Sequence, residues 1–134
     1  MPKLDYFLVA DSVSTDRERN TVSLFHILEE WPARLPLVIP QLVAVSSWTI
    51  PPEDMGRDFQ VTLNIRLPGD QEAPDFQIFP VNFTADRPRH RAYHFVKGLR
   101  VEHAGDMVFE ILINGRLAAS QVVWVRASEE SESG

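Results

Sequence analysis

The sequence contains no cysteine and only six glycines, and each shortage excludes a kind of chemistry. Without cysteine the chain has no disulfides and no thiolate nucleophile or ligand, so burial alone must hold the fold together. The six glycines are dispersed, so neither a G-x-G-x-x-G segment nor a phosphate-binding P-loop can be written. The nucleophile motif G-x-S-x-G is absent as well. These gaps argue against nucleotide chemistry and acyl transfer.

Long apolar runs and an excess of positive charge are also missing. The first apolar run stops at Asp11, which makes it too short and too acidic for a signal peptide or a membrane span and favours a cytoplasmic protein. The formal net charge is −6, of which Glu129, Glu130 and Glu132 supply three, so the remainder carries −3. Nucleic-acid binders are normally basic. Neither a nucleic acid nor a membrane is therefore expected as a partner.

The 134 residues are enough for one domain with a genuine core, and 44% of them are apolar. We expect a single β-sandwich domain over residues 1–127. The remaining residues, 128–134, read SEESESG and are expected to form a disordered acidic tail.

Alternation of apolar and polar residues is the dominant pattern of the chain. It is clearest over 59–67, where five large apolar side chains alternate with four polar ones. A strand places all five on one face, whereas a helix would scatter them. Similar β-rich segments predict eight strands, at 4–10, 21–28, 41–50, 59–67, 76–84, 91–96, 105–113 and 116–126. We therefore predict an all-β, two-sheet antiparallel sandwich with Greek-key connections and an immunoglobulin-like arrangement.

Prolines and two-sided apolar patterns refine this prediction. The first two segments form a long hairpin, after which Pro32, Pro36 and Pro40 suggest an extended connection that crosses between the sheets. Segment 41–50 has apolar residues on both sides, which is typical of a strand well inside the domain. Pro80 predicts that segment 76–84 lies at a sheet edge.

The segment Gly105–Arg126 has nearly all the sequence features of a β-hairpin, because Asn114-Gly115, the strongest short-range signal for a two-residue turn, joins its two β-rich segments. With Ile113 opposite Arg116, this turn predicts that Leu112 faces Leu117, Glu110 faces Ala119 and Val108 faces Gln121. The apolar residues at 107, 109, 111 and 113 then share the buried face.

The ordered segments DYFLVADSV, TVSLFHIL and GDMVFEILINGRLAASQVVWV, joined by a polar loop and a proline-spaced crossing, resemble a bacterial family of small β-sandwich proteins. That family is known only as a domain of unknown function. The last hairpin is also similar to those of immunoglobulin-like and fibronectin-like modules. The resemblance covers nearly the whole chain and implies the fold and a bacterial intracellular setting. It implies no catalytic residue.

Metal binding finds little support. His90 and His94 share one face of a strand and could in principle converge with His26 or His103 on zinc, but their Cβ atoms are about 13 Å apart on a straight strand. We interpret them as surface histidines. The acidic loops 53–58 and 70–75 flank opposite ends of one strand, so their carboxylates are not expected to combine. No metal or cofactor is predicted.

The most distinctive charge cluster is Arg87, Arg89 and Arg91 beside Tyr93. Arg89 and Arg91 project to the same side of an extended segment, and guanidinium groups beside an aromatic ring suit a carboxylate, a phosphate or an acidic protein segment. The alternative is a solvated surface whose arginines pair with neighbouring acids. A further hypothesis is that the cluster docks the acidic tail of the same or another copy.

The three tryptophans raise the question of a sugar-binding platform. Trp48 and Trp124 sit between apolar neighbours and are predicted to be core residues, whereas Trp31, beside Pro32, is the candidate for an exposed ligand-binding ring.

Two classes of function follow. The first is a non-catalytic protein-interaction or structural accessory module that binds a protein partner or associates with itself, through a sheet edge or through the arginine cluster. The alternative is a module that binds a small ligand or a carbohydrate. An enzyme is not expected, and the sequence does not name the partner.

Overall fold

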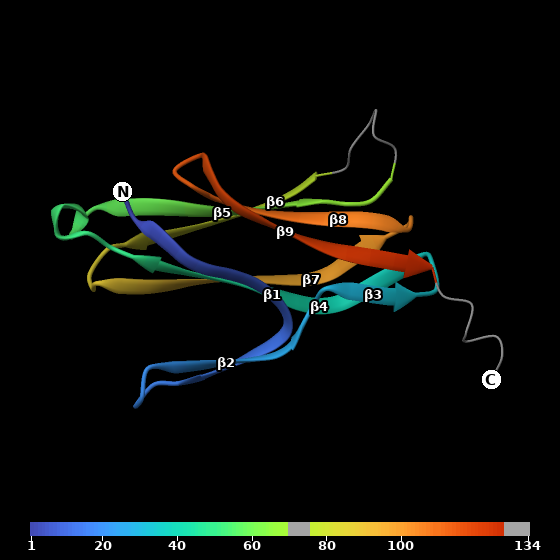
Figure 1. Ribbon diagram of the computed structural model, residues 1–134, viewed down its shortest axis with the longest axis horizontal. Helices are drawn as coiled ribbons and strands as arrows, with labels where there is room; N and C mark the ends of the chain where they lie inside the picture. The colour runs from blue at the N-terminus through green and yellow to red at the C-terminus, as the bar shows by residue number, and fades with distance from the viewer. Residues whose placement is uncertain (70–75, 128–134) are drawn as a thin grey trace.

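The computed structural model describes residues 1–69 and 76–127, so the tail predicted at 128–134 lies outside the described residues. The described part contains nine strands and one short 3-10 turn (Figure 1). Their bounds are β1 (Lys3–Asp16), β2 (Thr21–Ile27), β3 (Glu30–Ala33), β4 (Leu37–Thr49), η1 (Pro52–Asp54), β5 (Asp58–Arg66), β6 (Phe76–Thr84), β7 (Arg89–Val101), β8 (Gly105–Ile113) and β9 (Arg116–Ala127). None of the described residues forms a helix long and apolar enough to cross a membrane.

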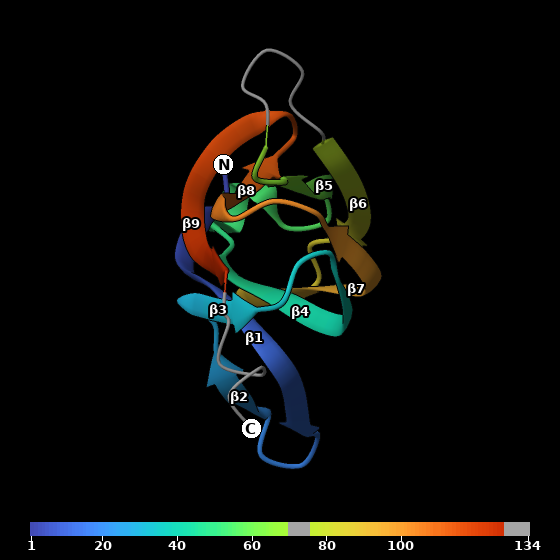
Figure 2. The same cartoon turned by 90° about the vertical axis from the view of Figure 1, so that its right-hand side faces the viewer.

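The strands form two sheets that face each other (Figure 2). Sheet A has the order β2-β1-β4-β7, and sheet B has the order β3-β9-β8-β5-β6. The predicted all-β, two-sheet sandwich is confirmed, and β6 lies at a sheet edge as Pro80 predicted. Two details were wrong, since the described strands number nine rather than eight and β3 pairs with β9 in parallel.

The missed strand lies in the segment that was expected to be a connection. Residues Glu30–Ala33 pair with Trp124–Ala127 despite Pro32. A proline is tolerated there because β3 is an edge strand, so only one side of its backbone pairs within the sheet. The structure also extends three predicted strands: β1 spans 3–16, β4 begins at residue 37 and β7 spans 89–101.

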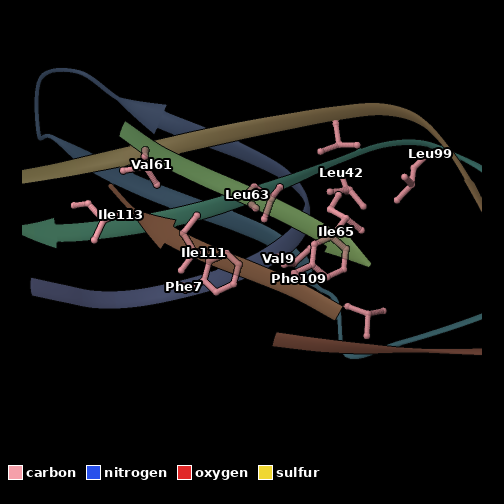
Figure 3. Close-up of a cluster of buried hydrophobic side chains, with 14 of the residues drawn as sticks. Phe7, Val9, Leu42, Val61, Leu63, Ile65, Leu99, Phe109, Ile111 and Ile113 are labelled. Atoms are coloured by element: carbon pink, nitrogen blue, oxygen red, sulfur yellow. The ribbon is translucent and has the colours of Figure 1, made fainter. Parts of the chain in front are cut away.

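The core lies between the sheets (Figure 3). On sheet B the inward side chains of β5 and β8 are all buried, as the alternation predicted: Phe59, Val61, Leu63, Ile65, Met107, Phe109, Ile111 and Ile113. They pack against apolar residues of β1, β4 and β7, among them Phe7, Val9, Leu42 and Leu99. Each fully buried large side chain contributes about 1.5–3 kcal/mol, so this double layer is the main source of stability.

The last hairpin begins as predicted and then shifts its register. Asn114 and Gly115 both have positive φ, 48° and 81°, and Leu112 faces Leu117. The register changes between Ile111 and Leu112, so that Glu110 faces Ser120 and not Ala119. Likewise Val108 faces Val122 and not Gln121. A β-bulge places one extra residue on β9, which reverses the faces predicted for the rest of that strand.

Strand β1 changes its pairing partner at Ala10. Residues Lys3–Ala10 pair with β4, and residues from Ala10 to Asp16 pair with β2. A hairpin between β1 and β2 does form, but its first strand is residues 10–16, most of which were expected to be a loop, and the predicted strand 4–10 pairs with β4 instead. Residues 11–27, which we call the arm, lie on the outer side of sheet A (Figures 1 and 2). A small apolar cluster joins the arm to this face: Val13 and Leu24 of the arm pack with Tyr6 and Tyr93 against the buried Ala10, Val43 and Val45.

Candidate functional site

The outer face of β7 carries most of the predicted site. Arg89, Arg91 and Tyr93 alternate with the buried Ala92 and His94, so the first three project away from the core. The strand register adds two residues that the sequence did not single out. Tyr6 of β1, Ser47 of β4 and Arg91 of β7 form one row across three neighbouring strands. This row is the floor of the candidate site.

The tip of the arm reaches the same place. Asn20 has a φ of 54°, in the left-handed region that asparagine tolerates better than most residues. Its side-chain Oδ1 accepts a hydrogen bond of 2.8 Å from Nη2 of Arg91, and its backbone carbonyl lies 3.4 Å from both Nη atoms. Asn20 is 71 residues from Arg91 in the chain. The sequence gives no signal of this contact, because it depends on how the arm folds over sheet A.

A hollow of about 470 Å³ lies between the arm tip and β7, and we call it the arginine pocket. All four predicted residues line it: Arg87, Arg89, Arg91 and Tyr93. Tyr6, Asn20 and Ser47 line it too. Its volume is within the range of small-molecule pockets, so it can hold a small organic ion or one side chain of a partner.

Two of the three guanidinium groups have acidic neighbours. Nε of Arg89 lies 3.4 Å from Oδ2 of Asp5, whose carboxylate also accepts a 2.9 Å hydrogen bond from Thr49. Nε of Arg87 lies 3.5 Å from Oδ1 of Asp86. These pairs agree with the alternative interpretation of the cluster as a surface that pairs with neighbouring acids.

Arg91 differs from the other two arginines. It is half-buried, and no carboxylate among residues 1–69 and 76–127 forms an ion pair with it. Its partner is the neutral Asn20. The pocket therefore contains a cationic group whose charge is not balanced by a described anion.

His90 forms part of the pocket wall. Its ring stacks on Phe83 with a centroid distance of 4.0 Å and an interplanar angle of 8°. Burial lowers the pKa of His90, an effect that Asp86 opposes and Arg87 reinforces. The neutral ring therefore adds an aromatic surface to the pocket at pH 7 and no charge.

The other histidine of β7 lies in the core, so its interpretation as a surface residue was wrong. His94 is only 2% exposed, and its Nε2 lies 3.1 Å from the carbonyl oxygen of Val61 on the opposite sheet. Even-numbered residues of this part of β7 face inward, which the short predicted strand did not reveal. Across the part of the chain that the structure describes, no group of three or more histidines and acids is placed to hold a metal, and the acidic loop 70–75 is outside that part.

The tryptophans also differ from prediction. Trp48 is buried as expected, with its Nε1 donating a 2.9 Å hydrogen bond to Oγ of Ser46. Trp31 is half-buried and packs against the core, so it is not the exposed ring that was predicted. Trp124 is 50% exposed instead, because the bulge in β9 turns Val123 and Val125 inward and Trp124 outward.

The hypothesis that the arginine cluster docks the acidic tail, of the same copy or of another, concerns residues 128–134, which lie outside the described residues.

The chain is thus a two-sheet β-sandwich with an arm over one face and an arginine-lined pocket at the arm tip. A family model matches residues 5–126, and the chain belongs to that family, which is described as "Family of unknown function (DUF6941)". The expected membership of an uncharacterised β-sandwich family is confirmed. No curated protein matches the chain.

Solved structures similar to the chain include two from Pseudomonas. One is the alkylpurine DNA glycosylase AlkC of Pseudomonas fluorescens bound to DNA containing an abasic site analog, with a TM-score of 0.58 and 12% identity. The match covers 94% of this chain and 30% of the glycosylase chain, and it shows a shared fold alone. The other is an immunoglobulin-like protein of Pseudomonas aeruginosa, with a TM-score of 0.48, 16% identity and coverage of 94% and 97%.

Proposed function

We propose that this chain is a non-catalytic protein-interaction module that binds a protein partner, or a second copy of itself, through the arginine pocket. The observation that carries the proposal is Arg91, a half-buried guanidinium group with a neutral partner in an open hollow. Arginine is favoured at protein interfaces because its planar fork forms paired hydrogen bonds with partner groups.

The surroundings of His90 support a structural role within the binding surface. Its ring stacks on Phe83 with the two ring planes nearly parallel. We therefore assign His90 a role in packing and pocket shape.

The experiment compares the full chain with Arg91→Met and with Arg100→Met, an exposed arginine of the same strand that pairs with Glu102. Light scattering after size exclusion, at low and high salt, measures self-association, and chemical cross-linking in cell extract measures partner capture. We expect an association that Arg91→Met and high salt both weaken and that Arg100→Met preserves. Identical behaviour of all three proteins, with no salt dependence, would reject the proposal.

Trp124 supports a second candidate, a module that binds a carbohydrate. Its exposed ring lies on the outer face of sheet B, and Asp106 and Glu30 occupy the neighbouring positions across the strands. An exposed indole beside carboxylates suits stacking on a sugar and hydrogen bonding to its hydroxyl groups. A thermal-shift screen of glycans against the wild type and Trp124→Ala would detect this, and equal shifts in both proteins would exclude it.

We also propose the immunoglobulin-like, Greek-key arrangement that the sequence predicts. Its support is the strand order, because β1-β4-β7 and β9-β8-β5-β6 correspond to A-B-E and G-F-C-C′ of an immunoglobulin sandwich. A bacterial, cytoplasmic setting remains part of the proposal, and cell fractionation would test the location.

A further inference from the structure

We infer that the arginine pocket recognises a carboxylate group of an acidic protein segment, and that Asn20 occupies the carboxylate position until the partner arrives. This inference rests on the proposed interaction function and names the chemistry of the partner. It is carried by the charges around the pocket, by the row of side chains on its floor and by the conformation of the arm tip.

The charges favour a single negative charge in the pocket. The three arginines and the carboxylates of Asp5 and Asp86 leave a balance of +1, since 3 − 2 = 1. One carboxylate neutralises this balance. A phosphate monoester carries about −1.5 to −2 at pH 7, so it would leave excess negative charge beside Asp86, which itself lines the pocket.

The floor of the pocket offers neutral donors in the right place. Tyr6 and Ser47 lie in the same cross-strand row as Arg91, and each has a hydroxyl group that can donate to an oxygen atom. Ser47 is only 1% exposed, whereas Tyr6 is half-buried, so the hydroxyl of Tyr6 is the more accessible of the two donors. A carboxylate above Arg91 can accept from the guanidinium fork while its other lone pairs accept from these hydroxyls.

Asn20 has the shape of a carboxylate without its charge. Its Oδ1 sits 2.8 Å from Nη2 of Arg91, the distance expected of an arginine–carboxylate hydrogen bond. The guanidinium already carries a charge, and a carboxylate adds the opposite charge and a second oxygen for paired hydrogen bonds, so an arriving carboxylate displaces the amide oxygen. The arm itself stays docked through Val13 and Leu24.

The position of Asn20 allows a sharp set of substitutions. Because its φ is 54°, glycine keeps the turn and removes the side chain, whereas aspartate keeps both the turn and the shape but adds a negative charge. Asn20→Asp should therefore pair with Arg91 permanently and close the site. Asn20→Gly should leave the site open.

The experiment is a titration of ¹⁵N-labelled protein with acetyl-triglutamate amide at constant ionic strength, followed through the Nε–H signals of the arginines. We expect a saturable shift at Arg91, abolished in Arg91→Met, weakened at least tenfold in Asn20→Asp and equal or stronger in Asn20→Gly. Arg100→Met serves as the control that leaves binding unchanged. Inorganic phosphate and a single-stranded DNA oligonucleotide are titrated in parallel and should bind at least tenfold more weakly.

Two results would overturn the inference: tighter binding of phosphate or the oligonucleotide than of the peptide, or wild-type peptide affinity in Asn20→Asp. Far-ultraviolet circular dichroism checks that each variant is folded. Because Asn20 is exposed, its variants are expected to fold, and they keep the test usable if Arg91→Met does not fold. The outcome is separable from that of the proposed function. If the peptide binds but no association depends on Arg91, the proposed interaction function is rejected and carboxylate recognition stands. If association depends on Arg91 but the peptide does not bind, carboxylate recognition is rejected and the interaction function stands.

Discussion

The two outer faces of the sandwich are built from similar strands but differ in what covers them. The outer face of sheet A buries Val43 and Val45 almost completely, because the arm packs over it. The arm covers only part of that face, since Phe95 of β7 is 63% exposed there. The outer face of sheet B leaves apolar residues in solvent, with Val122 48% and Trp124 50% exposed. Among the described residues, the arm therefore forms a third layer over sheet A alone. The arginine pocket lies at the tip of the arm, where this layer ends.

The difference originates in the apolar patterns of the strands. Between residues 42 and 48, β4 is buried on both sides, whereas β5 alternates strictly between buried and more exposed positions. A two-sided strand needs cover on both sides, and in sheet A the cover is supplied by a hairpin that β1 sends out after Ala10. Sheet B follows the ordinary pattern of an antiparallel sheet with one solvated face.

The largest effect should come from placing the same charge on each outer face. Val45→Asp buries an unpaired carboxylate under the arm, and we expect a loss of at least about 3 kcal/mol in the free energy of unfolding. Val122→Asp, on the exposed face, should change it by less than about 0.5 kcal/mol. Urea denaturation measures both. Similar losses in the two variants would show that the arm does not cover sheet A as described.

The sequence predicted the features that depend on local residue patterns and missed those that depend on contacts between distant segments. The alternation in β5 and β8 and the two-sided pattern of β4 are local, so the sandwich, its core and the interior position of β4 could be predicted. The faces of β9 could not, because one bulge residue reverses them and leaves no clear mark in the sequence. Trp124 was assigned to the core for that reason.

The residues of the candidate site likewise fall into those that the sequence predicted and those that it did not. The alternation of Arg89, Arg91 and Tyr93 along one strand was enough to place them together, and all of them line one pocket. Tyr6 and Ser47 enter it through strand order and register, which the sequence did not specify. Asn20 enters it through the docking of the arm, although its place in the polar turn before Thr21 marked it as a turn residue.

A second, smaller effect concerns the inner face of sheet A, where His94 is the buried titratable group. Burial lowers the pKa of His94, although the carbonyl of Val61 opposes this effect, and Nδ1 has no hydrogen-bond partner among the described residues. The unfolded chain binds a proton near pH 6.5, whereas the folded protein binds it only at lower pH. Stability should therefore be fully present above about pH 6.5 and fall as the pH drops towards the folded pKa, by at most about 1.4 kcal/mol per pH unit for this group.

His94→Leu isolates this contribution, because His90 also has a lowered pKa and changes stability in the same direction. The free energy of unfolding of the variant, measured by urea denaturation between pH 5 and 8, should depend less on pH than that of the wild type. If the wild type and His94→Leu have parallel pH profiles, His94 does not titrate differently in the folded and unfolded states.

The smallest expected effect tests the exposed face directly, through the accessibility of its tryptophan. Iodide quenches the fluorescence of indole rings that solvent reaches, so Trp124 should supply most of the quenchable emission and the 1% exposed Trp48 almost none. Trp124→Phe should remove most of the quenching while changing the free energy of unfolding by less than about 0.5 kcal/mol, as expected for a surface position. Trp31→Phe is the matched control, since its half-buried ring packs against the core and should account for little of the quenching. Strong quenching that persists in Trp124→Phe and disappears in Trp31→Phe would mean that β9 lacks the bulge and presents the opposite face to solvent.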